Sequence, residues 1–158
     1  MAIPEKLVEL IGKPIGEPQI WEVERGAIRR FAEAVDNPNP LYHDVEYARN
    51  SKYGEMIAPF GFYGWPVKGG LMEMMGLVIG PMLNAGYPVI LDAGVEFESF
   101  VPIRAGDTLV SYSRITDIVE KTTKSGKAML ISTIEMNFLN QNSDKALTAR
   151  SSIICREL

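Results

Sequence analysis

The amino-acid sequence predicts an α+β domain in which one long apolar helix packs against an antiparallel sheet. Between residues 66 and 83, apolar side chains recur at intervals of three and four, which is the spacing of a helix with an apolar face. Strand-like runs follow this helix, at roughly 89–100, 107–120, 127–140 and 145–155. A helix followed by a sheet favours a layered α+β architecture, and the pattern predicts one domain over residues 1–158.

The first third of the chain reads as short elements. Residues 4–11 are expected to form a short helix after Pro4. Residues 19–24 alternate between polar and apolar side chains and predict a strand, whereas residues 26–35 carry apolar side chains at helical spacing. These three segments should lead into the long helix through loops.

Prolines and glycines mark the loops that follow. Pro38 and Pro40 restrict the residues before them, so the helix over 26–35 must end there. Asp44 has the residue type of an N-cap for another short helix. Residues 59–66 form a loop rich in aromatic residues and glycine, and Pro66 suits the first turn of the long helix.

Two turn signals separate the last three strand-like runs. They lie at residues 124–126 and 140–144, which are rich in Gly, Asn, Ser and Asp. Short turns between adjacent strands indicate an antiparallel meander. A single sheet of this kind has open edges that invite pairing, so we expect a dimer or a higher even assembly.

The composition is that of an ordinary globular domain. Of 158 residues, 46% are hydrophobic and 23% are charged, and the formal net charge is −4. A nucleic-acid surface needs clustered Lys and Arg, so the acidic balance argues against a nucleic-acid partner. It leaves room for an anionic cofactor such as coenzyme A, because a few local basic groups suffice to bind one.

The single cysteine and the N-terminal residues bear on the compartment. Cys155 lies in an apolar run and is expected to be a buried structural thiol, and without an intrachain disulfide a reducing compartment is typical. Residues 1–6 lack the apolar core of a signal peptide. The uncharged stretch 74–91 is interrupted by Pro81 and Pro88, so it does not predict a membrane span. We expect a cytoplasmic protein that does not contact a membrane.

Three segments resemble the MaoC-like hydratases and dehydratases. They occur in the family's order and span most of the chain: residues 29–44 (RRFAEAVDNPNPLYHD), 53–60 (YGEMIAPF) and 97–109 (FESFVPIRAGDTL). Ala58-Pro59 stands where hydratases often have His-Gly, which points to the FAS1-like dehydratase branch (N-terminal MaoC) of this group.

The resemblance implies a hot-dog fold, with a central helix wrapped by an antiparallel sheet, and pairing of two hot dogs. It also implies reversible addition of water to a trans-2-enoyl thioester, giving the (R)-3-hydroxyacyl product. In the family an Asp and a His that flank an Asn-Pro pair handle the water, and a backbone amide at a helix start polarises the thioester carbonyl. No metal or separate cofactor is implied, since the substrate is carried as a coenzyme A or acyl-carrier-protein thioester.

The match departs from the family at the catalytic positions. With Asn39-Pro40 as the anchor, the family's Asp and His positions are occupied by Asn37 and Tyr42. An Asn cannot serve as the base. The available acid–base groups, Asp36 and His43, are each displaced outward by one residue.

Two interpretations follow. In the first, the proline-rich loop is shifted and Asp36, Asn39 and His43 form the catalytic site of a self-sufficient homodimer. In the second, which we prefer, this half-site is silent and the chain shapes the acyl pocket beside a catalytic MaoC-like partner. Structural roles compete with both, because Asp36 suits a helix end or turn and Asn39 a turn conformation.

The aromatic loop is the candidate substrate-binding segment, with core packing as an equally weighted role. The residues assigned to substrate binding are Tyr42, Pro59, Phe60, Gly61, Phe62 and Trp65. Two further functions stay open: a non-enzymatic acyl-thioester-binding subunit, and a hot-dog thioesterase, which would need a carboxylate beside the thioester.

Overall fold

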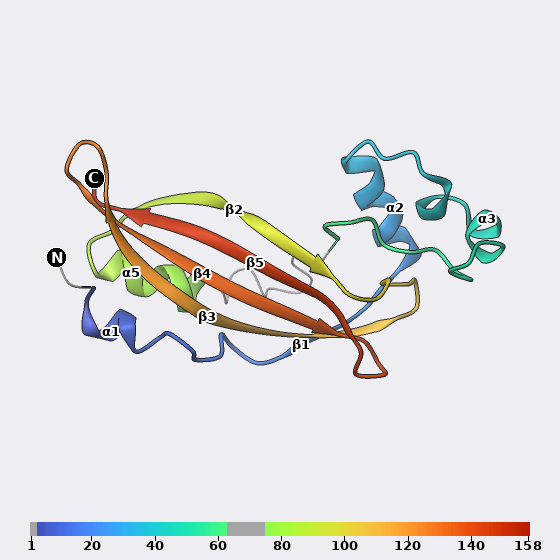
Figure 1. Ribbon diagram of the computed structural model, residues 1–158, viewed down its shortest axis with the longest axis horizontal. Helices are drawn as coiled ribbons and strands as arrows, with labels where there is room; N and C mark the ends of the chain where they lie inside the picture. Colours follow the sequence, from blue (N-terminus) through green and yellow to red (C-terminus); the bar gives the residue numbers. More distant parts are fainter. Residues whose placement is uncertain (1–2, 63–74) are drawn as a thin grey trace.

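The structure is a computed structural model that describes residues 3–62 and 75–158 (Figure 1). It contains a long, curved, five-stranded sheet with short helices at both of its ends. The helical elements are α1 (Glu5–Val8), α2 (Arg25–Ala34), the 3-10 turn η1 (Pro40–Tyr42), α3 (Val45–Arg49), the π-helical turn η3 (Met75–Ile79) and α5 (Gly80–Asn84). The strands are β1 (Gln19–Glu22), β2 (Val89–Ser99), β3 (Thr108–Thr122), β4 (Ala128–Leu139) and β5 (Lys145–Arg156).

The strand order is β1-β3-β4-β5-β2, and every pairing is antiparallel. The predicted meander is confirmed for β3, β4 and β5, which are joined by the two predicted turns. The run over 89–100 is a strand as expected, but it does not neighbour the next strand along the chain. Instead β2 pairs with β5 at the far edge, from Val89 opposite Arg156 to Ser99 opposite Leu147. The segment 100–107 therefore carries the chain from one side of the sheet to the other.

The core lies between the inner face of the sheet and the helical residues before β2. Along β4, every second residue from Ala128 to Phe138 is buried, which is the period of a strand with one face in the core. Val78, Ile79 and Met82 are buried and belong to the same apolar cluster as these β4 residues. This is the predicted packing of helix on sheet, seen here for residues 75–84.

The rest of the predicted long helix, residues 66–74, lies outside the described residues. None of the helices in the described ranges is long and apolar enough to cross a membrane. Cys155 is fully buried at the inner face of β5, and burial raises the pKa of its thiol, so the predicted structural role is confirmed.

The N-terminal elements agree with their predicted types and place the candidate loop. Residues 11–15 run beside β3, since the amides of Gly12 and Ile15 donate to the carbonyls of Ile115 and Ser113 at 2.7 and 2.8 Å. After β1, the chain forms α2 and α3 beyond one end of the sheet (Figure 1). Asp44 caps α3 as expected, accepting a 3.0 Å hydrogen bond from the Tyr47 amide.

The outer face of the sheet carries a charged row centred on Glu135 of β4. Arg114 of β3 and Arg150 of β5 flank it in register and donate to its carboxylate at 2.9 and 3.2 Å. Asn137 donates to the same carboxylate at 3.1 Å. The hydrogen bond from Asn137, helped by the two arginines and opposed by burial, lowers the pKa of Glu135.

Acid should therefore destabilise the fold in part through Glu135. A carboxyl whose pKa is lowered by folding contributes stability above its unfolded pKa and loses it as pH falls through the folded pKa. We expect Glu135→Gln to be less stable than the native chain at pH 7 and to lose less stability between about pH 5 and pH 2. Urea denaturation across this range measures the difference. Glu96→Gln is the control, because Glu96 is exposed and approaches Arg150 only to 3.8 Å; an equal flattening there would contradict the assignment.

Candidate functional site

Asp36 ends helix α2 rather than facing a cavity. Its backbone is left-handed, with φ 51°, and its side chain is exposed. The Asn37 amide donates to the Ala32 carbonyl at 2.9 Å and the Asp36 amide to the Glu33 carbonyl at 3.1 Å. These two bonds form a Schellman motif, in which the left-handed residue is usually Gly or Asn. Asp36 thus occupies a helix-terminating position.

The two asparagines of the loop bind backbone amides. The Asn37 side chain accepts from the Asn39 amide at 3.2 Å, and the Asn39 side chain accepts from the Leu41 amide at 3.0 Å. Asn39 is therefore the cap of the 3-10 turn η1. Both amide oxygens hold the proline-rich loop in place.

His43 closes the same loop. Its half-buried ring places Nε2 at 2.8 Å from the Asn37 carbonyl oxygen. A carbonyl oxygen only accepts, so Nε2 donates, and Nδ1 is the acceptor nitrogen of the neutral ring. No contact joins the Asp36 carboxylate to His43 among the interactions of the described residues. The structure does not bring these two predicted catalytic residues together as a pair.

Five of the six predicted substrate-binding residues surround one cleft of about 350 Å³. The cleft lies between residues 57–62 and residues 99–103, which run on from the end of β2. Its described lining contains no His, Asp or Glu. The lining residues are Tyr42, Tyr53, Ile57, Ala58, Pro59, Phe60, Gly61, Phe62, Ser99, Phe100, Val101, Pro102, Ile103 and Leu147.

Backbone hydrogen bonds hold the two walls of this cleft together. The Ala58 amide donates to the Ile103 carbonyl at 2.8 Å, and the Ala105 amide donates to the Met56 carbonyl at 2.9 Å. Asp107, which is buried, accepts from the Arg104 amide at 2.7 Å and so fixes the turn beneath the second wall. The Gly-Asp pair of the third sequence motif thus supports the cleft without lining it.

The aromatic loop divides between core and cleft. Phe62 is only 6% exposed, and its ring centroid lies 5.8 Å from that of Trp21 and 5.5 Å from that of Phe31. Phe60 is 71% exposed and meets Phe97 of β2 edge-on at 5.8 Å. The sixth predicted residue, Trp65, lies outside the described residues.

Gly61 lies where the loop passes the rings of Phe97 and Phe31. Its φ is +85°, and an added Cβ would contact Phe97 and Phe31 at 3.6 and 3.9 Å. A left-handed conformation favours glycine, so the backbone at this position explains the residue.

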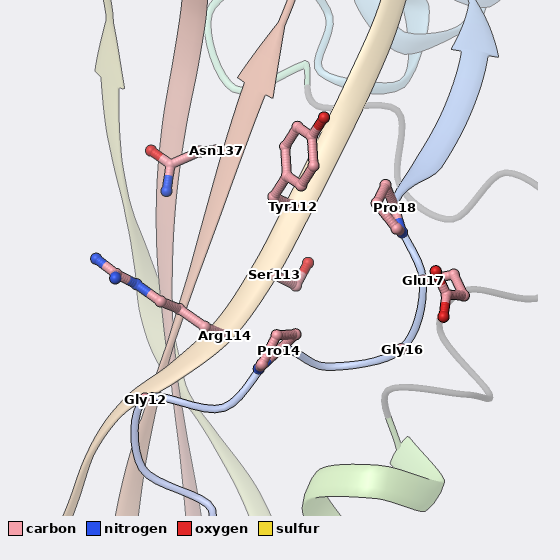
Figure 2. A pocket seen from close by; sticks show the side chains of 9 residues that line it. All are labelled: Gly12, Pro14, Gly16, Glu17, Pro18, Tyr112, Ser113, Arg114 and Asn137. Atoms are coloured by element: carbon pink, nitrogen blue, oxygen red, sulfur yellow. The ribbon is translucent and has the colours of Figure 1, made fainter.

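A second, larger hollow of about 610 Å³ lies at the β3 edge of the sheet. Figure 2 shows the segment from Gly12 to Pro18 running beside β3, with the side chains of Arg114 and Asn137 on the other side of that strand. Both of these groups are engaged by Glu135, and the Thr148 hydroxyl donates to Asn137 at 2.9 Å. The sequence did not predict this hollow, and two of its polar side chains, Arg114 and Asn137, belong to the charged row.

Metal binding by several side chains finds no support in residues 3–62 and 75–158. Within these ranges, no group of three or more His, Cys, Asp or Glu side chains could hold an ion.

Comparison with known proteins places most of the chain in one family. Residues 9–149 match the family described as "FAS1-like, dehydratase domain region". A UPF0336 protein of Thermobifida fusca is 28% identical over 151 residues, covering 94% of this chain and 92% of its own. A "Probable enoyl-CoA hydratase alpha subunit" of Thermomonospora curvata is 26% identical and covers 92% of this chain, which spans 49% of that protein.

Solved structures share the fold. A chain of the ChsH1-ChsH2 complex of Mycobacterium tuberculosis has a TM-score of 0.71 at 18% identity, covering 95% of this chain and 88% of its own. A chain of the C-terminally truncated HadBC (3R-hydroxyacyl-ACP dehydratase) complex from the same organism has a TM-score of 0.64 at 19% identity, covering 92% and 96%. At these identities the likeness establishes the fold alone, and the predicted hot-dog fold is confirmed.

Proposed function

Because the chain belongs to the family of FAS1-like dehydratase domain regions, we propose that it is the substrate-pocket subunit of an (R)-specific enoyl-thioester hydratase or 3-hydroxyacyl-thioester dehydratase. A second MaoC-like chain supplies the Asp and His that move protons. The observation that carries this proposal is a cleft whose described lining includes aromatic and aliphatic side chains but no His, Asp or Glu.

The identities and hydrogen bonds of the loop residues support a catalytically inactive half-site. Asn37 and Tyr42 occupy the positions at which the family carries Asp and His. The Nε2 atom of His43 is hydrogen-bonded to a backbone carbonyl, and Asp36 terminates a helix. Water is a poor nucleophile, and a positioned general base is worth about 10²–10⁴-fold in rate. Without such a base at the cleft, the chain needs one from its partner.

The β2 edge supports pairing with another chain. β2 is the outermost strand, and within the described residues nothing pairs with its other edge. Ile90, Leu91 and Val95 on this strand are 38%, 48% and 44% exposed. The exposed backbone groups of an edge strand can pair with another strand, and these three apolar side chains would be covered by such a contact. HadBC and ChsH1-ChsH2 are themselves complexes, and the Thermomonospora curvata relative is named as an alpha subunit.

The two alternative functions, a hot-dog thioesterase and a self-sufficient hydratase, each require a side chain that the described lining of the cleft does not present. A hot-dog thioesterase requires a carboxylate at the thioester, and the described lining of the cleft has no Asp or Glu. A self-sufficient hydratase requires the loop to release His43 from Asn37. Comparing crotonyl-CoA hydration by the chain alone and by the chain with its partner tests the proposal against both.

Acyl-chain length should control affinity. Ligand sites commonly measure about 300–1,000 Å³, so a cleft of about 350 Å³ suits an acyl group of a few carbons. Burial of one methylene is worth about 0.8 kcal/mol, which is about fourfold in affinity. We expect calorimetric Kd values to fall by about this factor per methylene from acetyl- to hexanoyl-CoA, and then to level off.

Phe60→Ala should flatten this dependence, because Phe60 lines the cleft without belonging to the buried core. Val8→Ala is the matched control, since Val8 is a similarly exposed apolar residue on α1 outside the cleft lining. Equal affinity for all chain lengths in the native chain would remove the acyl site.

A further inference from the structure

Two lysines lie against aromatic side chains of the cleft. The Lys52 ammonium is 5.1 Å from the ring centroid of Tyr53, and the Lys145 ammonium is 4.7 Å from that of Phe100. Both rings line the cleft. The two lysines come from distant parts of the chain, a turn after α3 and the start of β5, so the fold alone brings each of them to a ring that lines this cleft.

Neither lysine is neutralised by a carboxylate of the described chain. The ion pairs found in residues 3–62 and 75–158 are all made by arginines. Asp144, the acidic residue next to Lys145 in the sequence, accepts from the Asn140 side chain at 3.3 Å and makes no ion pair within the described residues. In a chain of net charge −4, this opening therefore combines an apolar interior with two cations.

The positions of the aromatic rings are fixed by the scaffold. The Arg104 guanidinium donates from Nε to the Tyr53 carbonyl at 3.1 Å, which ties the Tyr53 backbone to the opposite wall. The Phe100 amide donates to the Ala146 carbonyl at 3.0 Å, which ties Phe100 to β5 beside Lys145. Each ammonium is thus held near the cleft by a ring whose own backbone is anchored.

We infer that Lys52 and Lys145 bind the phosphate of the thioester carrier whose acyl group enters the cleft. This inference rests on the proposed function, which places an acyl thioester there. An ammonium group is a point-charge partner for phosphate, and its stem packs on the aromatic ring while its head stays in water. Coenzyme A and the pantetheine arm of an acyl carrier protein both carry phosphate, so the same two cations serve either carrier.

Calorimetry with two hexanoyl thioesters tests the inference on the full chain. Hexanoyl-CoA carries phosphates, and hexanoyl-N-acetylcysteamine carries none. For Lys52→Ala/Lys145→Ala we expect roughly tenfold weaker binding of hexanoyl-CoA, as two exposed ion pairs would give, and a change below about twofold for the phosphate-free thioester. The native affinity for hexanoyl-CoA should also fall toward that of the double variant near 1 M salt, where the Debye length is about 3 Å.

The matched control is Lys124→Ala/Lys127→Ala, in the turn between β3 and β4 at the other end of β4. It changes the net charge equally, and circular dichroism verifies that both double variants are folded. Equal loss of hexanoyl-CoA affinity in both double variants, or none in either, overturns the phosphate assignment while leaving the acyl site in place. No binding of either thioester to the native chain overturns the proposed function and the inference with it.

Hexanoyl-acyl carrier protein distinguishes the two phosphate sources. A loss with both carriers in Lys52→Ala/Lys145→Ala assigns the lysines to the pantetheine phosphate that the carriers share. A loss with hexanoyl-CoA alone assigns them to the additional phosphates of coenzyme A.

Discussion

Purified alone, the chain is expected to hydrate crotonyl-CoA at least about 100-fold more slowly than the same chain co-purified with a catalytic MaoC-like partner. General acid–base catalysis is worth about 10²–10⁴-fold in rate, and the described cleft lining has no His, Asp or Glu to act as the base. Loss of the enoyl-thioester absorbance measures the rate. Light scattering on both samples relates each rate to its assembly.

Substitutions at the displaced residues separate the two interpretations of the loop. In the assembled enzyme, Asp36→Asn and His43→Ala should leave the hydration rate within about threefold, beyond any loss of folded protein. Rapid turnover by the isolated chain that disappears in both variants would contradict the pocket-subunit role. It would instead assign catalysis to a rearranged loop, in which His43 leaves the Asn37 carbonyl.

Phe62→Ala should cost about 3–5 kcal/mol of unfolding free energy, the usual range for removing a buried phenylalanine. Phe62 packs between Trp21 of β1 and Phe31 of α2, so its ring joins the sheet edge, the helix and the cleft loop. Part of this loss in stability should come from weaker packing of α2 against the loop. Urea denaturation followed by tryptophan fluorescence measures the loss, since Trp21 contacts Phe62.

Phe60→Ala is the internal control for this measurement. The two phenylalanines are two residues apart in the same loop, yet Phe60 is exposed and contacts Phe97 only at its edge. We expect its substitution to cost about 1 kcal/mol or less in stability. Similar losses for both variants would mean that Phe62 does not anchor the loop.

Local patterns were sufficient to predict the strands. All four predicted runs begin and end within two residues of the observed strands, because alternating burial and the turn residues around Gly126 and Ser143 are both encoded locally. The ends of α2 and α3 could be predicted in the same way, since the prolines that stop α2 and the Asp44 cap of α3 act on neighbouring backbone groups.

The pairing of strands far apart in the sequence could not be predicted from local patterns. Nothing in residues 89–99 distinguishes pairing with β5 from pairing with β3, because both neighbours present apolar inner faces. The wall formed by residues 99–103 was likewise unforeseen, since it depends on backbone bonds to residues 56–58. The roles of Asp36 and His43 also depend on backbone geometry, one on a positive φ and the other on a carbonyl six residues earlier.

The position of β5 between β4 and β2 has a consequence for how the protein is made. During synthesis β2 leaves the ribosome well before β5, the strand with which it pairs, since β5 begins at Lys145 and β2 ends at Ser99. At roughly 5–20 residues per second, this wait lasts several seconds. Throughout it, both edges of β2 and the side chains of Ile90, Leu91 and Val95 are available to chaperones and to other nascent chains.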